Sequence, residues 1–181
     1  LARRSQRPRP RVLFVISTQT GGTPLTNRDL MACLSDEYEP LLLMCDARVI
    51  TLTRPTMSQE RADVLLARHV LAEPLTIASH TSGEYDATLM RWLSDFSVEF
   101  LHIRHLAWHS LNLPAIAQSL GIPVVLSFHD FYAACPALKL LDGAGTYCGG
   151  HCTSHDGDRT PDLWAAATPP PLKGRYIHQW R

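Results

Sequence analysis

Short apolar runs alternate along this chain with segments of helical periodicity, and this alternation limits the folds available to it. Residues 11–17 (RVLFVIS) have the length and composition of a strand that is covered on both faces, and residues 39–45 (EPLLLMC) are expected to form the second strand. The first run breaks into a Gly-Pro-containing turn before a helical segment begins. Strands and helices in alternation predict right-handed βαβ units and a parallel sheet.

The other expected elements follow from spacing and from turn residues. Residues 84–96 form the clearest amphipathic helix, because their large apolar side chains recur at helical intervals. Gly121 is expected to end a helix over 113–120. Further helices are expected from Thr26 or Asn27 to Leu34 and over 59–71, and further strands at 49–52, 74–77, 100–106 and 123–128.

These elements predict an α/β fold, a Rossmann-like open parallel sheet with helices on both faces. We expect this domain to span residues 11–160, with a Cys/His loop at 135–155. Residues 1–10 are rich in arginine and proline, which predicts a disordered leader or, alternatively, a basic arm that contacts anionic lipid. Residues 161–181 are expected to form a Pro-rich bend and the start of an unfinished helix.

The composition fits a folded domain, with 45% hydrophobic and 19% charged residues in a chain of 181. The formal net charge is zero, from 17 basic and 17 acidic residues, which argues against a nucleic-acid partner. No stretch has the roughly 20 apolar residues of a membrane span. We expect Cys33 and Cys45 to be small buried hydrophobes, and a cytoplasmic, reducing compartment, with at most peripheral contact with a membrane.

Polar residues gather where the expected strands end, at the sheet edge where open α/β folds bind ligands. The Gly21-Gly22-Thr23 turn allows close approach of a ligand to a helix N-terminus, although it could equally be only a tight turn. Strand alternation puts His102 and Arg104 on one face and His105 on the other. These groups are either structural or placed beside a polar ligand.

A buried strand is expected to end at His129 and Asp130. Their side chains would point apart on a regular strand, but both can face the crevice where the pleat ends. We expect His129 to face a ligand, and Asp130 either to do so or to fix the turn through backbone N–H groups.

A cysteine-containing loop follows and offers ligands for a tetrahedral metal. A structural zinc would use Cys135, Cys148, Cys152 and His155, with His151 nearby. The spacing is not that of a common zinc finger or ribbon, so a disulfide from Cys148 to Cys152 or Cys135, or inert cysteines, remain alternatives.

Taken together, three segments resemble the N-terminal domain of a retaining GT-B glycosyltransferase of the family-four type, in a bacterial branch with a cysteine-containing loop. They are the Gly21-Gly22-Thr23 turn, residues 99–106 (EFLHIRHL) and residues 121–136 (GIPVVLSFHDFYAACP). The resemblance covers most of residues 11–152. It implies a cytoplasmic hexosyltransferase of polysaccharide biosynthesis, whose partners are a nucleotide-sugar co-substrate and a saccharide or lipid-linked acceptor.

By this resemblance, His102 and His129 are the catalytic candidates. Gly21, Gly22, Thr23, Arg104, His105 and Asp130 would bind substrate. The resemblance also implies a missing C-terminal domain, so that these residues alone are expected to be inactive. A non-catalytic α/β binding module with a metal- or disulfide-braced interaction loop is the alternative. A receiver-type domain is disfavoured because the first strand ends without an acidic cluster.

Overall fold

The computed structural model describes residues 8–17, 22–56, 61–75, 81–129, 140, 146, 147 and 149. Within these ranges the chain forms three helices and six strands. In chain order they are β1 (Arg11–Ile16), α1 (Gly22–Leu34), β2 (Glu39–Cys45), β3 (Val49–Arg54), β4 (Val64–Val70), α2 (Gly83–Asp95), β5 (Val98–Ile103), α3 (Leu113–Ser119) and β6 (Val124–Leu126).

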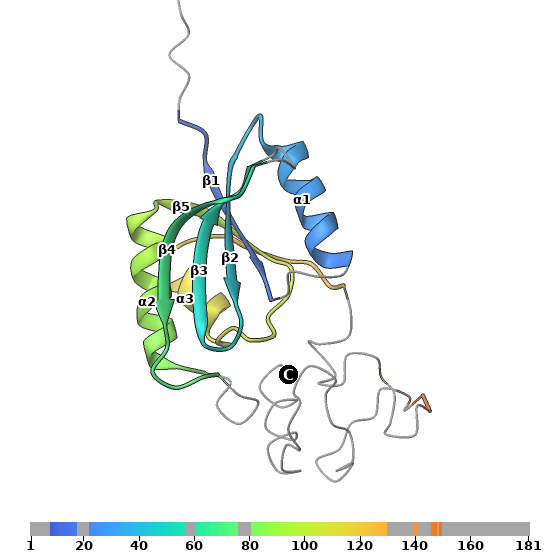
Figure 1. Ribbon diagram of the computed structural model, residues 1–181, viewed down its shortest axis with the longest axis vertical. Coiled ribbons are helices and arrows are strands. Elements are labelled where there is room, and N and C mark those ends of the chain that lie inside the picture. Colours follow the sequence, from blue (N-terminus) through green and yellow to red (C-terminus); the bar gives the residue numbers. More distant parts are fainter. Residues whose placement is uncertain are drawn as a thin grey trace, which may run out of the picture.

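The six strands form one twisted sheet in the order β4-β3-β2-β1-β5-β6 (Figure 1). Strands β2, β1, β5 and β6 run parallel to one another, as the alternation of elements predicts. Strands β3 and β4 pair antiparallel at one edge of the sheet. The Rossmann-like α/β class is confirmed, with this antiparallel edge as an addition to the parallel sheet.

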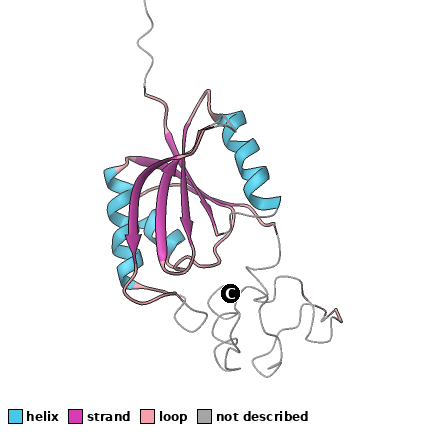
Figure 2. Cartoon of the chain, in the orientation of Figure 1, coloured by secondary structure: helices cyan, strands magenta, loops and turns pink. Residues whose placement is uncertain are grey.

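Helices cover both faces of the sheet (Figure 2). On one face Phe14 of β1 packs in a cluster with Met31 of α1. On the other face Leu13 and Val15 of β1 join a larger cluster with α2 and α3. Successive residues of β1 thus contact opposite layers, because side chains alternate along a strand and both faces are buried.

Helix α2 is the helix that the periodicity predicts most clearly. Ser82 caps it, and the Ser82 hydroxyl accepts a hydrogen bond from the Tyr85 backbone N–H at 3.2 Å. Its buried residues are Tyr85, Thr88, Leu89, Trp92 and Leu93. Gly121 has a φ of 71°, as expected of the residue that ends α3.

Two helix predictions are wrong. The helix predicted over 59–71 is wrong where the structure describes it, from residue 61 on, because Val64–Val70 is strand β4, which pairs with β3. This strand lies at the sheet edge, and its Leu65 side chain is 56% exposed, so the apolar spacing does not mark a buried helical face. Helix α1 begins at Gly22, and Asn27 is fully buried within it instead of capping it.

Some burial and strand predictions also fail. The strand that leads to His129 is not buried, because β6 is the other edge strand, and Val125 and Phe128 are 53% and 69% exposed. Cys45 is buried as expected, whereas Cys33 is exposed; both thiols are free. Pro74 and Leu75 belong to no strand. No helix in the described ranges is long and apolar enough to cross a membrane.

Candidate ligand site at the carboxyl edge of the sheet

The order of the strands reverses at β1, so the carboxyl ends of β1 and β5 form the topological switch point of the sheet. From β1 the chain passes through α1 to β2 on one side, and it later returns through α2 to β5 on the other side of β1. Ligands of open α/β sheets bind at such a reversal of strand order. Most of the predicted site residues that the structure describes lie near this point.

Arg104 follows β5 directly, and its side chain turns toward α1. Its Nη2 donates a hydrogen bond to Oγ1 of Thr26 at 3.0 Å. The residue is 9% exposed, and its Nε has no hydrogen-bond partner among the described residues. Burial lowers the pKa of the guanidinium. No carboxylate in the described ranges forms an ion pair with Arg104, so it is a largely buried cation without an acidic partner.

Helix α1 brings its N-terminus to the same end of the sheet. Its first residue is Gly22, and the first N–H groups of a helix lack partners within the helix. A Cβ placed on Gly22 would meet no other atom within 4 Å, and its φ is not in the left-handed region. Nothing in the described fold therefore requires glycine here, and the space above the residue is open.

His102 lies on the same face of β5 as Arg104, as the alternation predicts. Its ring packs against Phe14 with centroids 5.3 Å apart, and its Nε2 shares a hydrogen bond with Ser127 Oγ at 2.8 Å. Burial lowers the pKa of His102, and the charges of Arg104 and His129 lower it further. The imidazole is therefore biased toward its neutral form, in which it both donates and accepts a hydrogen bond.

His105 points to the opposite face, where it meets the end of β1. The Ala107 backbone N–H donates to His105 Nδ1 at 3.1 Å, so this nitrogen carries no proton. The Ser17 hydroxyl, 2.5 Å from the same nitrogen, must then be a donor. This is the arrangement in which an imidazole can accept a proton from a hydroxyl.

A second buried histidine, His109, was not expected from the sequence. Its Nε2 lies 2.9 Å from the Ile16 carbonyl oxygen, which can only accept, so Nε2 carries the proton. Its Nδ1 accepts from the Tyr85 hydroxyl at 2.6 Å. Burial lowers the pKa of His109 to about 4, which keeps this ring neutral. The pair links α2 to the end of β1.

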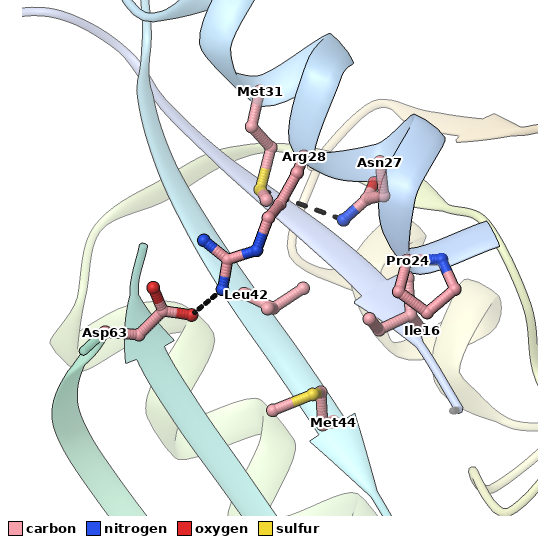
Figure 3. A pocket seen from close by; sticks show the side chains of 8 residues that line it. All are labelled: Ile16, Pro24, Asn27, Arg28, Met31, Leu42, Met44 and Asp63. Carbon is pink, nitrogen blue, oxygen red and sulfur yellow. Dashed lines mark hydrogen bonds and ion pairs between the residues drawn. The ribbon is translucent and has the colours of Figure 1, made fainter. Parts of the chain in front are cut away.

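Two cavities open near the carboxyl ends of β1 and β2. One, of about 220 Å³, lies between α1 and the sheet and includes Asn27 and Met31 (Figure 3). The other, of about 230 Å³, is lined by Ser17, Met44, Cys45, Asp46, Val49 and Thr51. Burial raises the pKa of the Cys45 thiol to about 12, so this thiol stays protonated in the second cavity.

The structure thus brings some of the predicted site residues together. Gly22 and Thr23 begin α1, and His102, Arg104 and His105 lie at the end of β5. His129 follows β6, and its charge acts on His102. Gly21, Asp130, Cys135, Cys148, His151, Cys152 and His155 lie outside the described residues, and with them the predicted zinc site or disulfide. In the described ranges no group of metal-ligating side chains comes together.

The groups that the sequence analysis missed are Ser17, Tyr85 and His109. Tyr85 stands at a core-facing helical position, so its hydroxyl gave no separate signal. His109 lies 93 positions from the carbonyl that it binds, and Ser17 lies 88 positions from His105. Only the pairing of β1 with β5 brings these partners together.

No protein-family model matches the chain, and no curated protein matches it. Among solved structures, it is similar to a secreted C11 cysteine protease from Bacteroides thetaiotaomicron at 12% identity and a TM-score of 0.33, over 52% of this chain and 28% of the protease. It is also similar to RuvC of Thermus thermophilus at 16% identity and a TM-score of 0.34, over 77% of this chain and 92% of RuvC. The same protein in complex with a Holliday junction substrate matches at 14% identity. Likeness at this level establishes no family.

The prediction of a retaining GT-B glycosyltransferase is not upheld: no family model or curated protein supports it, and the structures named above are a cysteine protease and RuvC. The predicted hexosyltransferase activity and the predicted sugar partners depended on this resemblance, so they are not upheld either. The comparisons do not uphold the exclusion of a nucleic-acid partner either; one of the RuvC structures contains a Holliday junction. The physical reason lies in the segments that carried the resemblance. A glycine turn and histidines at strand ends mark the ligand edge of any parallel α/β sheet, so they indicate the fold and not the reaction.

Proposed function

We propose that this domain is an α/β binding module that takes a small oxygen-rich anion at the carboxyl ends of β1 and β5. The observation that carries the proposal is Arg104, a cation that is 9% exposed and has no acidic partner among the described residues. A buried charge without a partner costs free energy, which a bound anion would recover.

The guanidinium is placed so that a ligand can reach it. Thr26, which accepts from Arg104 Nη2, is itself exposed, so the far end of the Arg104 side chain lies close to the surface. The Nη groups at that end can bind two oxygens of one ligand, whereas the unpartnered Nε is buried. Arginine binds carboxylate and phosphate oxygens in this two-point manner.

Two further groups favour an anion at this place. The N-terminus of α1, beginning at Gly22, brings the positive end of the helix dipole and the first-turn N–H groups of Gly22 and Thr23 to this end of the sheet. His102, on the same face as Arg104, can donate a hydrogen bond to the ligand or become protonated when a negative charge binds. The predicted interaction loop at 135–155 and the cytoplasmic location remain part of this proposal; the free thiols of Cys33 and Cys45 support a reducing compartment.

Isothermal titration of the whole chain with sulfate, phosphate and acetate tests the proposal. Arg104→Gln should weaken the binding of the preferred anion about tenfold or more, since a hydrogen bond to a charged group is lost. The matched control is Arg68→Gln, which removes an exposed arginine from β4 at the far edge of the sheet and should leave affinity unchanged. Equal affinity of the wild type and Arg104→Gln, or an equal loss in both variants, would overturn the proposal.

A further inference from the structure

The part of the sheet formed by β5 and β6, next to the proposed anion site, carries exposed apolar side chains. The apolar cluster beneath α1 is built on β1 and β2, and none of the described residues of β5 or β6 belongs to it. Phe100 of β5 and Val125 of β6 are 37% and 53% exposed. This surface is therefore open to a ligand that is itself partly apolar.

The pairing of β5 with β6 places Val125 on the same face as the proposed anion site. Val125 is the partner of His102 in the parallel register, so both side chains project from one face of the sheet. The hydrogen bond of 2.8 Å between His102 and Ser127, two residues after Val125, lies on this face as well. Arg104 follows His102 by two residues and so belongs to the same face, closer to the carboxyl edge.

The spacing along these strands suits a ligand with one apolar end and one anionic end. Two residues of a strand span about 7 Å, so the exposed surface of Val125 lies about one aromatic ring away from the level of Arg104. No salt bridge among the described residues involves β5, β6 or Arg104. An apolar strip without ion pairs thus ends at a single cation.

We infer that the anion of this site belongs to a small aromatic molecule, an aryl phosphate or aryl carboxylate, whose ring lies over Val125 beside His102. This inference rests on the proposed function and names the class of its ligand. The oxyanion binds the Nη groups of Arg104, and the ring displaces water from Val125. The half-buried imidazole of His102 adds an aromatic neighbour, and aromatic rings pack favourably against one another in offset or edge-to-face arrangements.

Two phosphate esters of equal charge isolate the contribution of the ring. Methyl phosphate carries the anion with a single methyl group, whereas phenyl phosphate adds the ring. Isothermal titration of the whole chain should show phenyl phosphate binding about tenfold more tightly, because the ring removes apolar surface from water. In NMR spectra of the methyl-labelled chain, the Val125 methyl signals should shift with phenyl phosphate and stay in place with methyl phosphate.

Variants of two exposed valines test where the ring lies. Val125→Ser removes apolar surface from β6 but keeps Arg104, and it should remove most of the preference for phenyl phosphate. Val70→Ser is the matched control, because Val70 is 42% exposed on β4 at the other edge of the sheet, and it should keep the preference. Arg104→Gln should weaken the binding of both phosphate esters about tenfold.

The results separate a failure of this inference from a failure of the anion site. Equal affinities of the two esters in the wild type, or a preference that stays the same in Val125→Ser, would overturn the inference and leave the anion site standing. If neither ester binds, or if Arg104→Gln binds phenyl phosphate as tightly as the wild type does, the anion site is wrong and the inference is wrong with it.

Discussion

Arg104 and Thr26, 78 positions apart in the chain, are joined by a hydrogen bond of 3.0 Å between Nη2 and Oγ1. This bond joins the end of β5 to the first half of α1. It lies beside β1, the strand at which the strand order of the sheet reverses. It leaves Arg104 Nε without a partner in the described part of the chain. One arginine thus joins two elements and keeps a buried donor without a partner among the described residues.

Gly22→Ala should separate binding from folding. Because no atom lies within 4 Å of the added Cβ, stability should stay the same or rise by up to about 1 kcal/mol. Sulfate affinity should fall severalfold if the ligand approaches the backbone at this residue. Gly83→Ala is the matched control, since Gly83 also begins a helix with open space around it, and it should not affect affinity. Urea unfolding and calorimetry measure the two effects; unchanged sulfate affinity in Gly22→Ala would remove this residue from the site.

The pKa of His102 should rise in Arg104→Gln. Burial lowers this pKa most, and the positive charge of Arg104 lowers it further, so removing that charge relieves part of the shift. Saturating sulfate should raise the His102 pKa in the wild type for the same reason. NMR titration of the imidazole signals measures both changes. A His102 pKa that falls or stays constant in the variant would show that Arg104 does not act on this ring.

Tyr85→Phe should destabilise the fold by about 1–3 kcal/mol, because His109 Nδ1 loses its buried donor. Tyr38→Phe is a suitable control: the Tyr38 ring contacts Phe100, but its hydroxyl forms no hydrogen bond with another described residue. Denaturant unfolding of both variants gives the comparison. Equal stabilities of the two variants would show that the Tyr85–His109 bond contributes nothing.

Stability should fall as the solution is acidified through the range set by His109. Its pKa is about 4 in the folded protein and near the ordinary 6.5 in the unfolded chain, so the unfolded chain binds the proton first. The stabilisation from neutral His109 is complete above the pKa of the unfolded chain and is lost as the pH falls toward the pKa of the folded protein. Between about pH 7 and about pH 5 the free energy of unfolding should therefore fall by about 2 kcal/mol. Urea unfolding at several pH values tests it, and constant or rising stability on acidification would contradict it.

Local patterns predicted most of the parallel core. Strand β2 occupies Glu39–Cys45 as expected, and α2 buries Tyr85, Leu89 and Trp92 on its predicted face. These elements are decided by short-range hydrophobic spacing, which the packing of the sheet then reinforces. The same kind of spacing gave a wrong prediction at Val64–Val70. Leu65 and Leu66 suit a helix or a strand equally well, and pairing with β3 makes this segment a strand.

The sequence predicts where the site residues lie in the sheet better than it predicts which side chains contact one another. The topology of a parallel sheet was enough to place His102, Arg104 and His105 at the ligand edge. Which groups meet there depends on long-range register, since Arg104 reaches Thr26 on α1 and His105 reaches Ser17 on β1. No local motif indicates that Arg104 is buried without an acidic partner among the described residues.

The most direct test of the anion site is to observe the Arg104 side chain itself during a sulfate titration. The Nε–H signal of Arg104, assigned by comparison with Arg104→Gln, should move progressively and saturate with the dissociation constant found by calorimetry. Such a shift is expected because the bound anion would lie against the Arg104 guanidinium, of which Nε is part. An Arg104 Nε–H signal that stays unchanged while sulfate binds elsewhere on the protein would contradict the account.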